Sequence, residues 1–287
     1  MNPLRFRISR LFLYFMLVTL FLFVSGNVGQ YLIEAQDIDR KIAMLLQGTI
    51  FTGLTLIVLY ILKRKNPISF KSIGLKGINS SSKMAIGIAL PFILLGVGIL
   101  TAYLFGGIEN LSMNLTTSVV ISVLINAITA FLYEAFPEEV FIRGLIFEEL
   151  QKKFSFFTSL FLQPLIFICV PITVMAMESM FFDKPFAVTI DYFILLFAFG
   201  IALQLYRAYT GSLWMNIIFH IVYLEVARYI SLGGAYESGV AILRFDETFE
   251  GFMSLYLSFL FMVILSIAIL SILILNDKRK IRHNRSL

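Results

Sequence analysis

The sequence predicts an all-α, polytopic integral membrane protein with about eight transmembrane helices. Of its 287 residues, 59% are hydrophobic and only 14% are charged, and the mean hydropathy is +0.89. Apolar runs of roughly 18 to 25 residues recur along the chain, which is the length that crosses the hydrocarbon core as a helix. Helices satisfy their backbone hydrogen bonds internally, so they are the spanning structure that such runs favour.

Eight runs are predicted to span the bilayer. In chain order they are Leu11–Val28, Ala43–Leu62, Met84–Phe105, Ser118–Phe136, Phe157–Met177, Phe186–Tyr206, Ser212–Ile230 and Phe252–Leu275. The first run follows Arg5, Arg7 and Arg10, an arrangement that also suits a signal peptide. Its apolar core is long for a signal peptide and no small-residue cleavage pattern follows it, which favours a retained helix.

Lysine and arginine are distributed unevenly between the two faces of the predicted bundle. Besides the three N-terminal arginines, one face collects six basic residues between the second and third runs and five in the tail. By the positive-inside rule, we expect a multi-pass protein of the cell membrane with both termini cytoplasmic. This topology and the attraction of basic residues to anionic membrane lipid explain the positive net charge, so no nucleic-acid partner is predicted. The six basic residues between the second and third runs and the five in the tail are, in order, Lys63, Arg64, Lys65, Lys71, Lys76, Lys83, Lys278, Arg279, Lys280, Arg282 and Arg285.

An ionisable cluster interrupts the apolar sequence after the fourth run. Glu138, Glu139 and Arg143 lie where the chain ought to be in lipid, and a charge there is costly unless it is paired or functional. Glu139 and Arg143 are four residues apart, so they share a helix face and form an ion pair of structural type. Glu134 and Glu138 have the same spacing, and a carboxylate of such a pair can act as a general base for water. The alternative is that helix four ends here and the charges are solvated, but the apolar run resumes at Gly144.

A second polar group lies in the seventh run. His220 is the only histidine within a predicted span, and Asn216 precedes it by one helical turn on the same face. A lone histidine on a helix is more often a core residue than a catalytic one. Asn216 supplies a second polar side chain that could donate to a developing oxyanion, which favours a site. Glu225 and Arg228 follow near the end of this run and are interpreted as an interfacial ion pair.

These residues resemble the CPBP family, which comprises type II CAAX prenyl endopeptidases and bacterial bacteriocin-processing or self-immunity proteins. The resemblance is carried by the EExxxR pattern of Glu138, Glu139 and Arg143, and by Gly-Ser-x-Trp leading into His220 on an apolar helix. It implies that Glu138 activates water to attack a peptide bond and that His220 stabilises the oxyanion. On this basis the chain divides into residues 1–83 with two N-terminal transmembrane helices and a basic cytoplasmic loop, a CPBP-like core at 84–230, and residues 231–287 with an outer loop, the last transmembrane helix and a basic cytoplasmic tail.

Two positions depart from the family pattern. The second family motif, FxxxH, aligns with the stretch from Phe167 to Pro171, so proline stands where the pattern has histidine. The third motif, HxxxN, begins at His220 and ends at Leu224, so leucine replaces asparagine. Neither side chain can accept a proton or donate a hydrogen bond. Asn216 is the candidate for the missing donor, and Glu134 or Glu178 is the candidate for the missing support of the base.

Three functions remain open from the sequence. The protein is an intramembrane endopeptidase acting on a membrane-associated peptide or protein, or a catalytically degenerate member that binds such a partner as a regulator or immunity factor, or a transporter. We expect the site to be a cavity opening toward the cytoplasmic half. No cofactor is predicted, although a divalent metal such as zinc, held by Glu134, Glu138 and His220, is the alternative, since zinc takes three protein ligands of these types.

Overall fold

The computed structural model describes residues 6–65, 70–75, 77, 80–231, 241–249 and 254–283. Arg5, Lys76, Arg285 and Phe252, the predicted start of the eighth run, lie outside these ranges. Within them, eight helices are long and apolar enough to cross a membrane, so the prediction of a mostly helical polytopic protein is confirmed. The α-helices are α1 (Ile8–Glu34), α2 (Arg40–Lys65), α3 (Ser81–Leu104), α4 (Thr117–Ala130), α5 (Phe136–Glu138), α6 (Phe147–Gln151), α7 (Phe156–Phe182), α8 (Ile190–Thr210), α9 (Leu213–Val226) and α10 (Leu265–His283).

Four π-helical stretches are inserted between these helices, namely η1 (Phe131–Ala135), η2 (Glu139–Ile146), η3 (Ala227–Ser231) and η4 (Ser254–Ile264). The segment from α4 through η1, α5 and η2 to α6 is one continuous span of 35 residues, Thr117–Gln151. The fourth run therefore does not end at Phe136 as predicted. The alternative of a solvated helix end is wrong as well, because Glu139 and Arg143 inside this span are 0% exposed. π-Helical turns are rare, and they are frequently found at functional sites.

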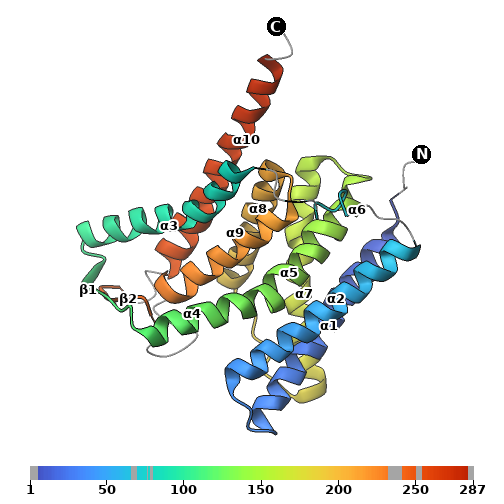
Figure 1. The fold of residues 1–287 in the computed structure, drawn as a ribbon, viewed down its shortest axis with the longest axis horizontal. Helices are drawn as coiled ribbons and strands as arrows, with labels where there is room; N and C mark the ends of the chain where they lie inside the picture. Colours follow the sequence, from blue (N-terminus) through green and yellow to red (C-terminus); the bar gives the residue numbers. More distant parts are fainter. Residues whose placement is uncertain are drawn as a thin grey trace.

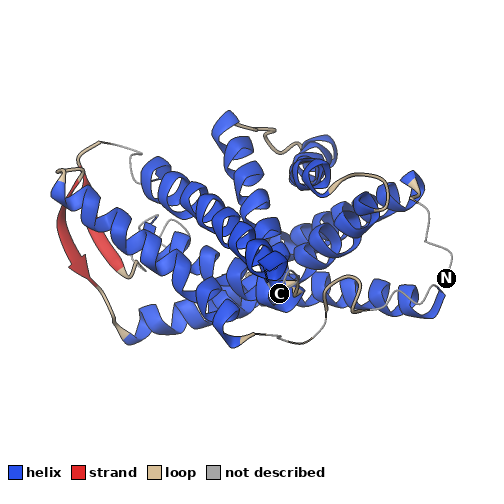
Figure 2. Ribbon diagram, turned by 90° about the horizontal axis from the view of Figure 1, so that it is seen from above, coloured by secondary structure: helices blue, strands red, loops and turns tan. Residues whose placement is uncertain are grey.

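Among the described residues, the departure from an all-α fold is a two-stranded antiparallel sheet of β1 (Ile108–Met113) and β2 (Leu243–Glu247). Ile108 pairs with Glu247 and Met113 pairs with Leu243. The sheet joins the segment before α4 to the segment before the last span, and it lies at one edge of the molecule (Figure 2). We call this the strand end of the bundle, and the opposite end, where α3 begins and α8 ends, the basic end (Figure 1).

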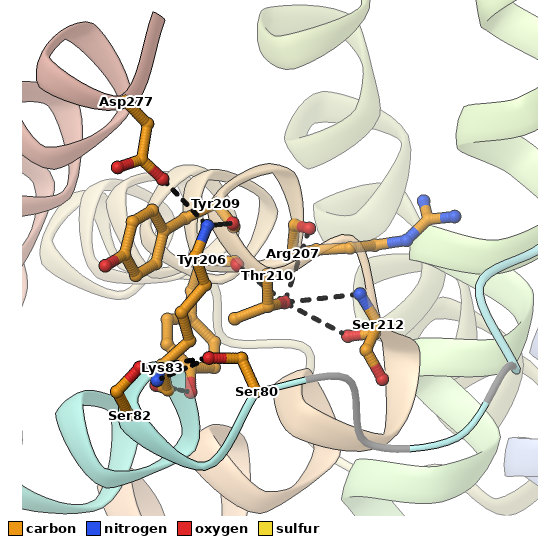
Figure 3. Close-up of polar contacts among 9 residues, drawn as sticks. All are labelled: Ser80, Ser82, Lys83, Tyr206, Arg207, Tyr209, Thr210, Ser212 and Asp277. Carbon is orange, nitrogen blue, oxygen red and sulfur yellow. Dashed lines mark hydrogen bonds and ion pairs between the residues drawn. The ribbon is translucent and has the colours of Figure 1, made fainter. Parts of the chain in front are cut away.

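Polar side chains tie four helices together at the basic end (Figure 3). Lys83 Nζ donates to the carbonyl oxygen of Tyr209 at 2.7 Å and to Asp277 Oδ2 at 2.8 Å. The hydroxyl of Tyr206 donates to the carbonyl oxygen of Lys83 at 2.9 Å. Gly211, with φ +68°, then ends α8 in the left-handed conformation that glycine adopts without strain. These contacts fix where α9 begins relative to α3, α8 and α10.

The hydrophobic core consists of two clusters that meet along α9. One packs α3, α8, α9 and the last span, with Leu203 and Phe219 fully buried. The other packs α1, α2, η2 and α9, with Phe51, Phe141 and Ile217 buried. The polar residues of η2 and α9 therefore lie where the two clusters join. This placement sets up the candidate site.

Candidate active site around Glu139 and Glu138

The carboxylate of Glu139 is the centre of a fully buried polar network. Its Oε1 lies 3.0 Å from His220 Nδ1 and 3.2 Å from Arg143 Nη1. The side-chain amide of Asn216 donates to its Oε2. His220 is 2% exposed and the other three residues are 0% exposed. Since a carboxylate only accepts hydrogen bonds, the proton of this contact lies on Nδ1, and the contact determines both the tautomer and the orientation of the His220 ring.

The local helix geometry explains why these four side chains meet. Asn216 and His220 are one turn apart on α9, and Glu139 and Arg143 are four residues apart in η2, so each pair shares a face of its helix. The guanidinium carbon of Arg143 also lies 4.6 Å from the centroid of the Phe167 ring, a cation–π geometry. The predicted Glu139–Arg143 ion pair is therefore present. Breaking a buried pair of this kind costs more than its formation contributes, because one charge is left unpaired.

A cavity of about 330 Å³ lies beside this network. Glu134, Glu138, His220 and Arg228 are on its wall, and the rest of the wall is mostly apolar. Arg228 Nη2 donates to Glu134 Oε2 at 2.6 Å and to Oε1 at 2.8 Å. Glu138 and Glu139 are adjacent in sequence, yet Glu138 faces the cavity and Glu139 faces the buried network. The apolar wall comes from Val18, Leu22, Phe167, Val170, Leu195 and Phe199, among others.

Comparison with known proteins identifies this region. Residues 120–224 match the family described as type II CAAX prenyl endopeptidase Rce1-like. This segment is a CPBP family domain. It extends from α4 to α9 and contains Glu138, Glu139, Arg143, Asn216 and His220. The resemblance seen in the sequence is thereby confirmed for this part of the chain, whereas no curated protein and no solved structure matches it.

The two departures from the CPBP pattern lie at the site itself. Pro171 of α7 and Leu224 of α9 line the same cavity as Glu138 and His220. Residues of all three stretches that align with the family motifs therefore line one cavity. At two of the positions where the family pattern has polar groups, the cavity wall of this protein is apolar instead.

None of the three residues considered as substitutes for the missing groups is placed to replace them. Asn216 is not among the residues that line the cavity, and its amide donates to Glu139. Glu178 lies at the strand end of α7, where it forms an ion pair with Lys184 at 3.2 Å. Glu134 is on the cavity wall, but it is held by Arg228.

The sequence interpretation of Glu225 and Arg228 as a mutual ion pair was wrong. Arg228 pairs with Glu134, and Glu225 Oε1 accepts a hydrogen bond from the Asn126 side chain at 2.5 Å. Arg228 is thus a cavity residue that sequence reasoning missed. The signal that could have identified Arg228 is its position inside an apolar run. It lies there at a depth similar to that of Glu134 in the antiparallel span.

The cavity also differs from the expectation in its position. Its wall is formed by residues from Tyr192 to Phe199 in α8, and by residues from His220 to Arg228 in α9 and η3. These ranges are the first half of α8 and the second half of the seventh span, which both extend toward the strand end. The cavity therefore extends away from the basic end, whereas the sequence predicted an opening toward the cytoplasmic half, to which it assigned the basic residues.

The donor set for a metal ion does not form. Among the residues that the structure describes, no three His, Cys, Asp or Glu side chains are close enough to hold an ion. Of the set considered from the sequence, Glu134 is paired with Arg228 and His220 Nδ1 is engaged by Glu139. The arrangement does not fit a zinc centre of three protein ligands, and no step of the chemistry below uses a metal.

Proposed function

We propose that this protein is an intramembrane endopeptidase that hydrolyses a membrane-associated peptide or protein, with Glu138 as the general base. The observation that carries the proposal is that Glu138 and His220 share one cavity wall, while Glu139 and Arg143 hold His220 from the buried side. The family match over residues 120–224 supports the reaction class. In the orientation that we propose, the basic end and both termini face the cytoplasm of a cell.

The chemistry follows from the placement of the two side chains. Glu138 takes a proton from water as the water oxygen bonds to the carbonyl carbon of the peptide, and the carbonyl oxygen becomes an oxyanion. The C–N bond then breaks, and the proton on Glu138 passes to the leaving amine. His220 donates to the oxyanion from Nε2, which requires the imidazolium form because Nδ1–H already donates to Glu139. The Glu139 carboxylate stabilises that imidazolium.

We expect this enzyme to be slow compared with a CPBP domain that has the full pattern. Leu224 removes one oxyanion donor, and loss of one such donor typically costs about a hundredfold to a thousandfold in rate. Pro171 removes a histidine beside the base, and proton-transfer groups contribute about a hundredfold or more. Both replacements are on the cavity wall, so both affect the reacting groups directly.

A second candidate function is binding without hydrolysis. Pro171 and Leu224 make the cavity wall more apolar next to Glu138, which favours retention of an apolar segment of another membrane protein or peptide. Such a protein would act as a regulator or as an immunity factor. The same cavity serves both functions, so only the fate of the bound peptide separates them.

Restoring the missing groups separates the two functions. The protein, Glu138→Gln and the double variant Pro171→His with Leu224→Asn are each reconstituted in nanodiscs with synthetic membrane-anchored peptides, lipidated and unlipidated, and products are measured by mass spectrometry. The endopeptidase proposal expects slow cleavage by the natural protein, none by Glu138→Gln, and a rate at least about a hundredfold higher in the double variant. Leu165→His, which adds a histidine on the exposed face of α7, is the control and should leave the rate unchanged. Binding without cleavage by every variant would establish the second function.

A further inference from the structure

Polar side chains continue from the cavity toward the strand end between two antiparallel spans. We call this row the polar seam. It consists of Ser122, Asn126 and Glu134 on the fourth span, and Glu225, Arg228 and Tyr229 on the seventh. A row of ionisable and amide side chains within spans is costly in lipid and indicates a functional path by default.

The members of the polar seam contact one another across the two spans. Arg228 holds Glu134 at the cavity, and Asn126 donates to Glu225 at 2.5 Å closer to the strand end. Glu225 and Arg228 are three residues apart on the seventh span, so they share its face. The hydroxyl of Tyr229 donates to the carbonyl oxygen of Ser122 at 3.2 Å. These three contacts follow one another from the cavity to the first turns of α4.

A second hollow lies at the far end of the polar seam. It has a volume of about 40 Å³ and is lined by Lys41, Ser122, Asn126 and Tyr229 together with Arg40 and Thr129. Lys41 Nζ donates to Ser122 Oγ at 3.2 Å, which joins the start of α2 to the seam. Arg40 is exposed, so this hollow adjoins the surface at the strand end. The cavity and the smaller hollow therefore lie at the two ends of the polar seam, and the wall of the smaller hollow also includes the apolar Met44 and Ile125.

Glu225 has hydrogen-bonding capacity that the described side chains do not satisfy. Its Oε1 accepts from Asn126, but its Oε2 is buried and has no hydrogen-bond partner among the described residues. Leaving a buried carboxylate oxygen unsatisfied costs about 1–3 kcal/mol or more. In native proteins such groups are met by water that bridges neighbouring polar atoms. The midpoint of the seam is therefore suited to hold water.

On the opposite side, toward the basic end, apolar side chains pack around the buried network of Glu139, Arg143 and Asn216. Ile142, Ile146, Leu213 and Ile217 lie between the cavity and the basic end, and each is at most 1% exposed. The segment 70–75 covers them, because the amide of Leu213 donates to the carbonyl oxygen of Gly74 at 2.7 Å. A close-packed interior of this kind contains few voids that admit water.

We propose that water and protons reach Glu138 along the polar seam from the strand end of the bundle. The inference rests on the proposed function in one respect: a glutamate base in the membrane needs a supply of water. Access along the seam can be measured without any catalysis. Absence of peptide cleavage therefore leaves this proposal standing, and failure of access along the seam leaves the role of Glu138 as general base to the cleavage experiment.

Cysteine accessibility tests the route. Cys169, the only cysteine of the chain, is changed to alanine, and Ala227→Cys places a single thiol on the cavity wall. Gln36→Cys and Gln151→Cys, both at exposed positions on opposite ends, report which end faces the reagent. A charged, membrane-impermeant methanethiosulfonate is added to intact cells and, separately, to inside-out vesicles. Labelling is read by the mass shift of the purified protein.

The expected result is that the Ala227→Cys thiol is labelled only in the preparation in which Gln36→Cys is labelled. Adding Asn126→Leu should slow this labelling at least about tenfold, because thiol reactivity depends on access. Leu124→Phe adds comparable bulk on the lipid side of the same helix and should have no effect. Ser122→Leu, at the smaller hollow, provides a second block if Asn126→Leu does not give a monodisperse protein. Labelling from the Gln151 side, labelling at an unchanged rate in both blocked variants, or no labelling at all would each overturn the proposal.

Discussion

The buried pair of Glu139 and Arg143 allows a quantitative test of the network that holds His220. Glu139→Leu removes the partner that lies 3.2 Å from Arg143. The guanidinium then keeps only the Phe167 ring, because none of its nitrogens makes a hydrogen bond with the described residues. Leaving a charge buried without its partner costs about 3–5 kcal/mol. The cation–π contact offsets up to about 2 kcal/mol, but the buried Asn216 and His220 also lose the carboxylate that accepts from them, so we expect a loss within that range of about 3–5 kcal/mol.

Replacing Arg143 is predicted to lower the free energy of unfolding by less than replacing Glu139 does. In Arg143→Met, the carboxylate of Glu139 still accepts from His220 Nδ1 and from Asn216. We expect a loss of about 2 kcal/mol, comparable to the loss of one charge-assisted hydrogen bond. The double variant, Glu139→Leu with Arg143→Met, leaves no unpaired charge and should be at least about 1 kcal/mol more stable than the sum of the single losses predicts.

Trp214 is the probe for this double-mutant cycle. It is the only tryptophan of the chain, and its ring centroid lies 5.9 Å from that of Phe136 on the neighbouring span. Unfolding by SDS in mixed micelles is followed by its fluorescence, and the free energies of unfolding of the four proteins are compared. Ile128→Leu, at a lipid-facing position, controls for general effects of substitution. Additive losses in the double variant would refute the coupling between the two charges.

Three further predictions use the same fold. Gly87→Ala should lower the free energy of unfolding by about 2 kcal/mol through overpacking, because an added Cβ would lie 2.0 Å from the buried Tyr206 hydroxyl. Gly96→Ala is the control on the same helix: its Cβ meets nothing within 4 Å, so the free energy of unfolding should not change in the same assay. Asp277→Asn should lower the free energy of unfolding by less than about 1 kcal/mol, since its ion pair with Lys83 is partly exposed and such pairs are weak. A larger loss in the unfolding assay would contradict this prediction. Cys169 is exposed on α7 within a span, so a charged maleimide should label it in intact membranes at least about tenfold more slowly than after SDS denaturation, because the thiolate does not form in lipid. Equal labelling before and after denaturation would argue against burial of this face in the membrane.

The spans were predictable because their signal is local. An apolar run of sufficient length forms a helix in a bilayer whatever its neighbours are, since its backbone N–H and C=O groups must hydrogen-bond within the segment. Helix boundaries were less accurate: α1 begins at Ile8 and ends at Glu34, whereas the predicted run covers Leu11–Val28. The two strands were missed, because pairing of β1 with β2 joins segments far apart in the chain. No periodicity within either segment reports that contact.

The sequence by itself determined the membrane class, the eight spans and the residue types of the site. The spacing of four between Glu139 and Arg143 was sufficient to pair them, because helix geometry alone brings such residues together. The different surroundings of the Glu138 and Glu139 side chains are set by the tertiary structure alone. One carboxylate faces a cavity and its neighbour accepts from Asn216 and His220, which depends on where α9 packs against the fourth span. The partner of Arg228 and the position of the cavity at the strand end depend on the same packing, because contacts between distant spans are not encoded in the period of either one.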